Sequence, residues 1–298
     1  MTVLTKTSLR FKIADAVYIA IMIIPIIAGI VIRVLTRAPS DGIEITGAQI
    51  FLKIPMPLQD FYITESQVNS ALVLIVILGL CLYLTHGLNE HIKLRRQHFA
   101  ELIVEKVDGL VKENMGAHFI GFAPFIIAMM ALSALSSLLS LFGLYPPTSD
   151  INIVGGWAIL VFFLITYYKM KCGPLHYLKS MAEPVALLAP INLISEFATP
   201  VSMAFRHYGN ILSGTVISVL LATALGGLSS SLLGWLPGFI SEFPLFRVGI
   251  PAVLSLYFDI FSALLQAFIF AMLTMMYVSG GFDFEEFKKR KARKNKTK

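Results

Sequence analysis

The sequence predicts an all-α polytopic membrane protein with about six hydrophobic helices, the last two of them long, tilted and paired as a hairpin. Composition is the first observation behind this prediction. Of the 298 residues, 56% are hydrophobic and only 14% are charged, whereas soluble domains average about 25% charged residues. The second observation is a series of long apolar runs, and the third is the clustering of Lys and Arg between them.

Six apolar runs are long enough to cross a bilayer, for which about 20 residues suffice. The predicted spans are residues 13–35, 66–86, 118–143, 153–170, 190–228 and 249–280. The first run follows Lys6, Arg10 and Lys12, which is also the layout of a signal peptide. Its apolar stretch exceeds the roughly 7–15 residues of a signal-peptide core, and no clear cleavage site precedes Arg33, so an uncleaved anchor is favoured.

Basic residues orient these spans, because cytoplasmic connections are enriched in Lys and Arg. Segments 87–115 and 169–180 are rich in basic residues and are expected inside, together with both termini. Connection 143–152 has no basic residue and 230–248 has only Arg247, so both are expected outside. Within segment 87–115, residues 99–111 predict an amphipathic helix on the cytoplasmic membrane surface, because apolar and charged side chains take separate helical faces.

Three parts of the chain are expected. Residues 1–62 hold the anchor and an external connection, residues 63–281 form the main membrane domain, and residues 282–298 form a basic cytoplasmic tail. From Phe287 onward this tail carries eight of the 24 basic residues. It is typical of a cytoplasmic tail that follows the positive-inside rule, and no nucleic acid is expected as a partner.

The fifth and sixth runs are too long for ordinary spans. Residues 190–228 would form a helix of roughly 58 Å, against a hydrocarbon core of about 30 Å. Either Pro200 breaks this run or the helix crosses the membrane at a steep tilt. The sixth run, 249–280, has the same excess length. The two therefore predict a pair of helices that wraps around a partner.

Arg206 lies in the middle of the fifth run, where an arginine costs roughly 2.5–3.5 kcal/mol on insertion scales. Ser202, Asn210 and Ser213 share its helical face, which makes one narrow polar seam. One alternative is an arginine that extends to the lipid headgroups, which is typical of helix ends rather than of the middle. Another is an ion pair that only locks two helices together.

The sixth run carries a complementary seam. Regular α-helical spacing places Asp259, Ser262, Ala263 and Gln266 on one face. A carboxyl group in the hydrocarbon region suits proton relay, and the alternative is a salt bridge from Asp259 to Arg206. Gln266 both donates and accepts hydrogen bonds, so it suits orienting Arg206 or holding a chain of water molecules.

These residues carry a family resemblance. The stretches PINLISEFATPVSMAFRHYGN and LLQAFIFAMLTMMYVS, with PPTSDIN before the fourth span, resemble the a subunit of the F-type ATP synthase membrane sector, over roughly residues 63–281. The resemblance implies a non-catalytic, ion-translocating subunit with two half-channels, the ion being expected to be a proton. Arg206 resembles the family's essential arginine, which faces the carboxylate of the rotating c-subunit ring.

The resemblance also assigns roles to the other candidate residues. Asn210 and Gln266 match the polar residues beside the arginine. Glu196 resembles the acid of the cytoplasmic half-channel, and Asp150 the acid at the outer entrance. Asp259 matches the sixth-helix position that holds a histidine or a carboxylate in other members.

The implied partners are the c-subunit ring, the b-subunit stator stalk, other ATP synthase subunits and the lipid bilayer. The implied location is the bacterial inner (plasma) membrane, with several passes. No cofactor is expected: there is no G-x-x-x-x-G-K-[ST] motif for a nucleotide. Cys81 and Cys172 lie far apart in the sequence, so no disulfide is implied, and no metal site is expected.

The sequence departs from the family pattern at two places. Thr215 stands where some members have a glutamate, so the relay acid is expected on the sixth helix alone. Residues 133–144, SALSSLLSLFGL, offer serines where some members carry an asparagine or aspartate. The outer half-channel is therefore expected to rely on serines, water and Asp259.

Two rival classes are disfavoured. A secondary transporter predicts internal repeats, and the Arg206 segment has none. A membrane-embedded hydrolase needs a nucleophile beside a base. The helical neighbours of His207, which are Met203, Ala204, Asn210 and Ile211, include no nucleophile.

Overall fold

The fold is almost entirely helical. The computed structural model describes residues 9–36, 47–57, 60–88, 95–174, 177, 189–233, 253, 256–285, 287–288 and 290. In chain order its principal elements are α1 (Leu9–Thr36), β1 (Ile50–Ile54), β2 (Phe61–Thr64), α2 (Glu65–Thr85), α3 (Arg95–Met115), η1 (Ala117–Phe122), α4 (Ala123–Leu138), η2 (Leu139–Phe142), η3 (Pro147–Ser149), α5 (Ile151–Cys172), α7 (Ala189–Leu233), η5 (Tyr257–Ser262) and α10 (Ala263–Gly280).

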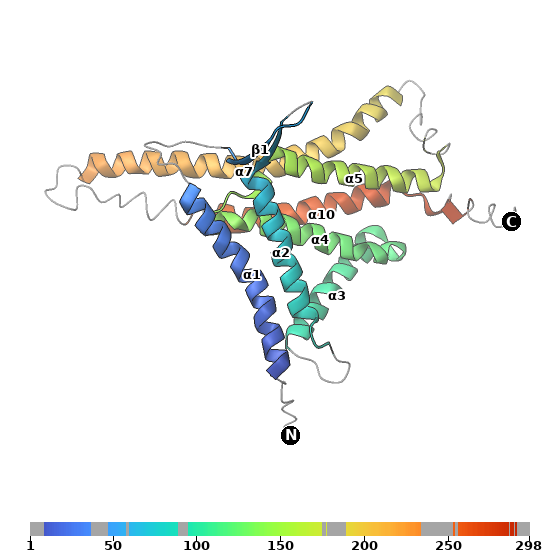
Figure 1. Ribbon diagram of the computed structural model, residues 1–298. Helices are drawn as coiled ribbons and strands as arrows, with labels where there is room; N and C mark the ends of the chain where they lie inside the picture. The colour runs from blue at the N-terminus through green and yellow to red at the C-terminus, as the bar shows by residue number, and fades with distance from the viewer. Residues whose placement is uncertain are drawn as a thin grey trace.

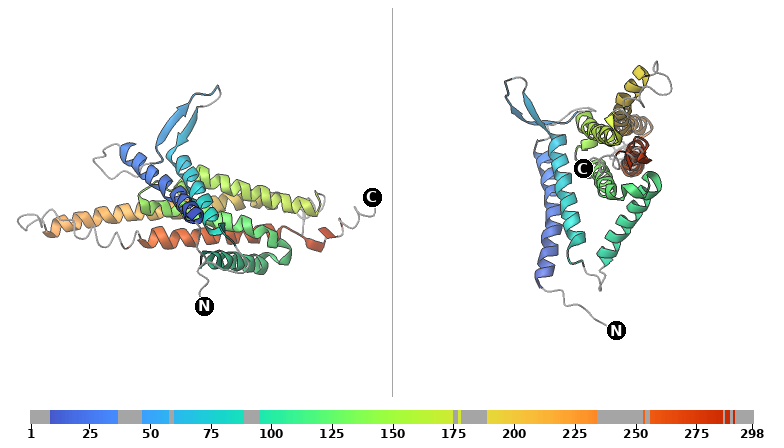
Figure 2. Two further views of the ribbon diagram at one scale, coloured as in Figure 1. Left: turned by 60° about the horizontal axis from the view of Figure 1, so that its bottom comes forward. Right: turned by 90° about the vertical axis from the view of Figure 1, so that its right-hand side faces the viewer.

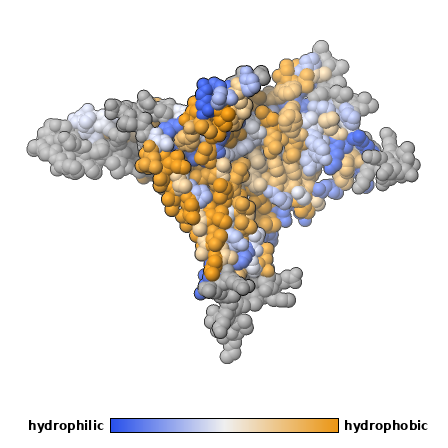
Figure 3. Space-filling model, viewed as in Figure 1, coloured by the Kyte–Doolittle hydropathy of each residue, from blue (hydrophilic) through white to orange (hydrophobic). Residues whose placement is uncertain are grey.

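Among the described residues, six helical segments are long and apolar enough to cross a membrane, and each falls on a predicted span. The prediction of an all-α polytopic membrane protein is therefore confirmed. Apolar side chains cover α1 and α2 on the face shown in Figure 3, while hydrophilic residues gather around the hairpin above them. Residues 249–252 of the sixth predicted span, 234–248 of the connection before it and 291–298 of the tail lie outside the described residues.

The helices form two groups that cross each other. Helices α1 and α2 lie side by side, and α4, α5, α7 and α10 run at a steep angle to them (Figure 1). The second group forms the main core, where α3 and η1 also contribute buried side chains. The right-hand view of Figure 2 looks along that bundle and shows α1 and α2 packed on one side of it. A smaller apolar cluster around Leu72 and Leu144 joins the flank to the bundle.

Helix α7 decides between the two alternatives for the fifth span. It is one helix of 45 residues with Pro200 inside it, so the proline does not end it. At 1.5 Å per residue it is about 68 Å long, more than twice the hydrocarbon thickness. Its first part leaves the line of the remainder (Figure 1), as expected for a helix that contains proline. A helix of this length lies strongly tilted in a bilayer.

A β-hairpin between the first two spans is an element that the sequence did not predict. Strands β1 and β2 pair antiparallel, with Ile54 opposite Phe61 and Ile50 opposite Thr64. The backbone N–H of Glu65 donates to the carbonyl of Gln49, so the hairpin leads directly into α2. The hairpin therefore has a fixed position above one end of the helical bundle.

The amphipathic helix is confirmed as α3, but its apolar face is divided. Val111 and Met115 are buried in the main core beside α4 and α10, whereas Phe99 and Leu102 are exposed. The C-terminal half of α3 therefore packs against the bundle. Only its N-terminal half presents apolar side chains outward, as a helix on a membrane surface does.

Candidate functional site

Arg206 lies on the exposed face of α7. Ser202 and Ser213 are exposed on this helix as well, while Asn210 is half-buried. Within the described residues Arg206 makes no ion pair, so the predicted alternative of a salt bridge to Asp259 is not found. The Arg206 side chain is exposed on the surface of α7.

Asn210 connects the Arg206 helix to the sixth span. Its amide Nδ2 donates to Ser262 Oγ at 2.6 Å. Gln266 is buried beneath this contact at the start of α10, with 4% of its surface exposed. Of the two polar residues that accompany Arg206 in the prediction, Asn210 therefore lies at the contact between α7 and the sixth span, and Gln266 is buried within the protein.

Asp259 lies in a π-helical turn, Tyr257–Ser262, so the assumption of regular α-helical spacing here was wrong. A π turn holds more residues than an α turn and shifts the direction of every side chain after it. Ser262 consequently faces Asn210, and Ala263 and Gln266 are buried. Asp259 itself is only partly buried. Such π turns occur frequently at functional sites.

A small cavity of ≈ 20 Å³ adjoins Asp259. It has room on the scale of a single water molecule. Its wall brings together the serines of the third span, the polar residue of α7 and the position where other members have glutamate, namely Ser137, Ser140, Asn210 and Thr215. The predicted departures from the family pattern thus lie side by side.

A much larger cavity, of ≈ 690 Å³, lies beneath the hairpin and reaches α7 at Tyr208. Asp150 lines it and caps α5 by accepting a hydrogen bond from the backbone N–H of Asn152 at 3.0 Å. The hydroxyl of Ser66 also donates to Asp150. Burial raises the pKa of Tyr145 on the same wall, and the negative charge of Asp150 raises it further.

A third cavity, of ≈ 190 Å³, contains Glu196 at the opposite end of the bundle. The Glu196 side chain is 7% exposed and lies 2.7 Å from Lys169 Nζ. The phenol of Tyr177 donates to its other carboxylate oxygen at 2.7 Å. Burial, this hydrogen bond and the charge of Glu196 raise the pKa of Tyr177 well above its ordinary value of 10, so the phenol keeps its proton.

Lys169 and Tyr177 are functional candidates that the sequence reasoning missed. Lys169 counted only as one of the basic residues that orient the spans, and no sequence signal pointed to Tyr177. Both lie far from Glu196 along the chain, in α5 and just after it. Only the packing of α5 against α7 brings them to that carboxylate.

The two larger cavities reach α7 on opposite sides of Arg206. Thr199 lines the cavity of Glu196, and Tyr208 lines the cavity beneath the hairpin. Nine residues of helix separate these two contacts, which is about 14 Å along the axis. Arg206 therefore lies between two cavities at opposite ends of the bundle, each with a carboxylate side chain in its lining.

His207 has a neighbour that the sequence did not reveal. Ser133 Oγ of α4 lies 3.3 Å from His207 Nε2, which is a hydroxyl beside an imidazole. Both residues have no exposed surface, and the rings of Trp157 and Phe270 meet the imidazole edge-on. No substrate reaches this pair, so it does not form the site of a hydrolase.

Comparison with known proteins identifies the family. A family model described as "ATP synthase A chain" matches residues 68–279. The chain belongs to the family of F-type ATP synthase subunit a. It is 28% identical to the ATP synthase subunit a of Trichlorobacter lovleyi over 231 residues, which are 74% of this chain and 90% of that protein. It is 34% identical to the subunit of Priestia megaterium over 194 residues, or 61% of this chain and 77% of that one.

One relative is named for its ion. The chain is 35% identical to "ATP synthase subunit a, sodium ion specific" of Propionigenium modestum over 145 residues, which are 48% of this chain and 43% of that protein. Family membership makes the chain an ion-translocating, non-catalytic, multi-pass membrane subunit of the ATP synthase complex. The enzyme is the complex as a whole.

Proposed function

We propose that the chain provides two half-channels and one arginine to a rotating ring of c subunits, and that the coupling ion is a proton. The observation that carries this proposal is the position of Arg206, exposed and unpaired within the described residues, between cavities that approach α7 from opposite ends. A continuous channel would leak ions without rotation. Two separate cavities make the ion travel with a partner between them.

Each candidate residue has a step in this path. Asp150 receives the ion at the outer entrance beneath the hairpin, and Asp259 relays it past the serines of the third span to a ring carboxylate. Glu196, at the other end of the bundle, receives it on the cytoplasmic side. Asn210 joins α7 to Ser262 of the sixth span, and Gln266 is buried one turn later, so that the arginine has a constant position against the ring.

The physical logic depends on charge in lipid. A ring carboxylate that has bound a proton is neutral and turns into the bilayer, whereas an ionised one faces a large desolvation penalty there. Arg206 stabilises the ionised carboxylate as it passes between the half-channels. Arginine suits this role because its guanidinium stays charged at any physiological pH, unlike the more readily deprotonated lysine.

The proposal extends to partners and placement. Residues 63–281 form the translocating domain, with the c ring on the exposed face of α7 and the b-subunit stalk as a stator. The membrane is the bacterial plasma membrane, and both termini are cytoplasmic, which agrees with the basic residues near each terminus. The ion is tested by measuring ATP-driven acidification of vesicles with and without Na⁺. Pumping that requires Na⁺ would replace the proton in this proposal.

Replacement of the arginine tests the proposal directly. We expect Arg206→Ala to abolish ion-coupled ATP synthesis while the complex still assembles, because this side chain has no ion-pair partner among the described residues of its own chain. Ser202→Ala, an exposed change one helical turn away, is the control and is expected to retain synthesis. Normal coupled synthesis in the assembled Arg206→Ala complex would exclude the proposed role.

A further inference from the structure

Helix α1 lies outside the part of the chain that matches the family, yet it packs closely on α2. A Cβ added at Gly79 would lie 2.8 Å from Met22 Cγ and 3.3 Å from the carbonyl oxygen of Tyr18. A Cβ at Gly29 would lie 2.9 Å from Leu72 Cδ1. Small residues allow helices to approach in this way within lipid. Helix α1 is therefore packed as part of the folded unit.

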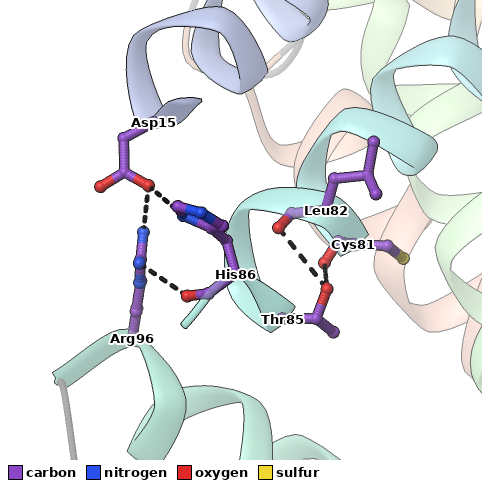
Figure 4. Close-up of polar contacts among 6 residues, drawn as sticks. All are labelled: Asp15, Cys81, Leu82, Thr85, His86 and Arg96. Carbon is purple, nitrogen blue, oxygen red and sulfur yellow. Dashed lines mark hydrogen bonds and ion pairs between the residues drawn. The ribbon is translucent and has the colours of Figure 1, made fainter. Parts of the chain in front are cut away.

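Charged groups hold the first end of α1. Asp15 Oδ1 accepts a hydrogen bond from Arg96 Nη1 at 2.6 Å and lies 3.1 Å from His86 Nδ1 (Figure 4). Arg96 also donates to the carbonyl of His86 at 2.7 Å. Three helices meet at this point, because His86 directly follows α2 and Arg96 lies in the first turn of α3.

The other end of α1 carries a second ion pair, beside the hairpin. Arg33 Nη1 lies 3.3 Å from Glu65 Oε1, and the Glu65 side chain is only 6% exposed. A buried carboxylate needs a compensating charge, since an unpaired one is strongly unfavourable. In the described part of the chain, Arg33 is the only cation paired with Glu65. The first turn of α2 therefore depends on α1 for its neutrality.

Residues in and just after this turn of α2 donate hydrogen bonds to residues that line the large cavity. Ser66, next to Glu65, donates to Asp150. Asn69, one turn later, donates from Nδ2 to the carbonyl of Tyr145 at 2.8 Å. The negative charge of Glu65 contributes to the raised pKa of Tyr145, so the electric field of Glu65 reaches the cavity wall. The titratable groups that line the cavity are Asp60, Tyr62, Tyr145, Asp150 and Tyr208, with Lys53 paired to Asp60 at 2.7 Å.

We infer that α1 is a permanent part of the outer ion entrance, and that Arg33 is a positioning residue which neutralises Glu65 and so keeps Ser66 on Asp150. The inference rests on the proposed role of Asp150 at that entrance. It gives the N-terminal helix a task in ion uptake rather than in membrane targeting. Arg33 acts through Glu65 and α2 and does not itself touch the ion.

The test uses the intact complex in vesicles, with ATP synthesis driven by an acid–base transition and measured against external pH. Arg33→Gln leaves a negative charge unpaired beside the entrance, which strengthens proton binding there. The external pH at half-maximal rate is expected to rise by about one unit, and the maximal rate to fall. In the double variant Arg33→Gln/Glu65→Gln no charge is left unpaired, so the wild-type profile is expected to return.

Asp15→Asn is the matched control. It weakens the other end of α1 through Arg96 and His86, away from the cavity, so the external pH profile is expected to stay unchanged. An unchanged profile in Arg33→Gln would overturn the inference. A double variant that is as impaired as Arg33→Gln would also overturn the inference. That result would mean that Arg33 only holds α1 and α2 together and does not act by neutralising Glu65. If Arg33→Gln fails to assemble, the double variant decides: assembly with a normal profile supports the inference, and failed assembly overturns it.

Two further measurements separate this inference from the proposed function. The mass of the subunit in the purified complex is expected to include α1, and a chain cleaved after it would overturn the inference alone. Asp150→Asn tests the entrance itself. If this variant keeps the wild-type rate and profile, the proposed entrance fails, whatever Arg33 does.

Discussion

At the residue scale, the environment of Glu196 is determined by side chains that are distant in the sequence. From the sequence it is an isolated acid in an apolar run, resembling the acid of a half-channel. In the structure it has two donors, the ammonium of Lys169 and the phenol of Tyr177, each at 2.7 Å. Both donate hydrogen bonds to the carboxylate, and hydrogen bonds to a charged group are stronger than those between neutral groups. The position of the Glu196 side chain therefore depends on two residues that lie elsewhere in the sequence.

The Tyr177 hydrogen bond can be removed without changing charge. Tyr177→Phe is expected to slow ATP-driven pumping by roughly tenfold, since a hydrogen bond to a charged group contributes about 1.5–3 kcal/mol. The raised pKa of Tyr177 means that the phenol stays protonated up to at least its ordinary value of 10, so wild-type pumping between about pH 6 and 9 should show no titration of this group. The measurement is the initial pumping rate in vesicles across that pH range.

The control for this change is another tyrosine at the same end of α5. Tyr167 is 58% exposed and is not one of the two described donors to Glu196, so Tyr167→Phe is expected to pump at the wild-type rate. Equal rates for Tyr177→Phe and the wild type would show that Lys169 alone supports Glu196.

At the scale of elements, the sequence predicted existence and order well and local geometry poorly. The six spans follow from hydropathy, because a bilayer demands long apolar helices. The hairpin β1–β2 was missed, because it is not a membrane-spanning helix and hydropathy gives no signal for it. The π turn at Asp259 was missed too, because regular α-helical spacing was assumed there. The contacts of Glu196 fall in the same class, because they join residues that are 27 and 19 positions apart.

Substitution of two glycines in different helices tests two contacts, the packing of α2 on α1 and the proposed approach of the c ring to α7. A Cβ at Gly209 of α7 would meet nothing within 4 Å, whereas one at Gly79 of α2 would collide with α1. We expect Gly209→Val to assemble normally but to lose coupled ATP synthesis, because the added bulk stands where the ring must approach. Gly79→Val is expected to reduce assembly, since overpacking costs about 1–3 kcal/mol. Subunit content of the purified complex and synthesis rate distinguish the two. Wild-type synthesis in Gly209→Val would mean that no partner approaches α7 closely at this point.

At the scale of the whole molecule, the exposed face of α7 predicts where a partner lies. Cysteines introduced by Ser202→Cys and Ser213→Cys are expected to crosslink to a cysteine on the outer helix of a c subunit. The control is Ala204→Cys, since Ala204 is buried against α5 and should not react. Cys81 is exposed and is first replaced by serine, while Cys172 is buried. Crosslinked product is measured by gel electrophoresis of the oxidised complex. Equal reaction at all three positions would rule out a single ring-facing side.

If the two large cavities serve as the proposed half-channels, their positions along α7 also determine where the membrane voltage acts. A polar cavity takes the electrical potential of the solution to which it opens, so on the proposed path the voltage drops between the cavities. That gap is about 14 Å along α7, against about 30 Å of hydrocarbon, which roughly doubles the field. A unit charge that crosses it gains about 2.3 kcal/mol per 100 mV. Because a helix as long as α7 must lie strongly tilted in a bilayer, this field points largely along the membrane plane, and on the proposed path the voltage acts sideways on the ionised ring carboxylates that pass Arg206.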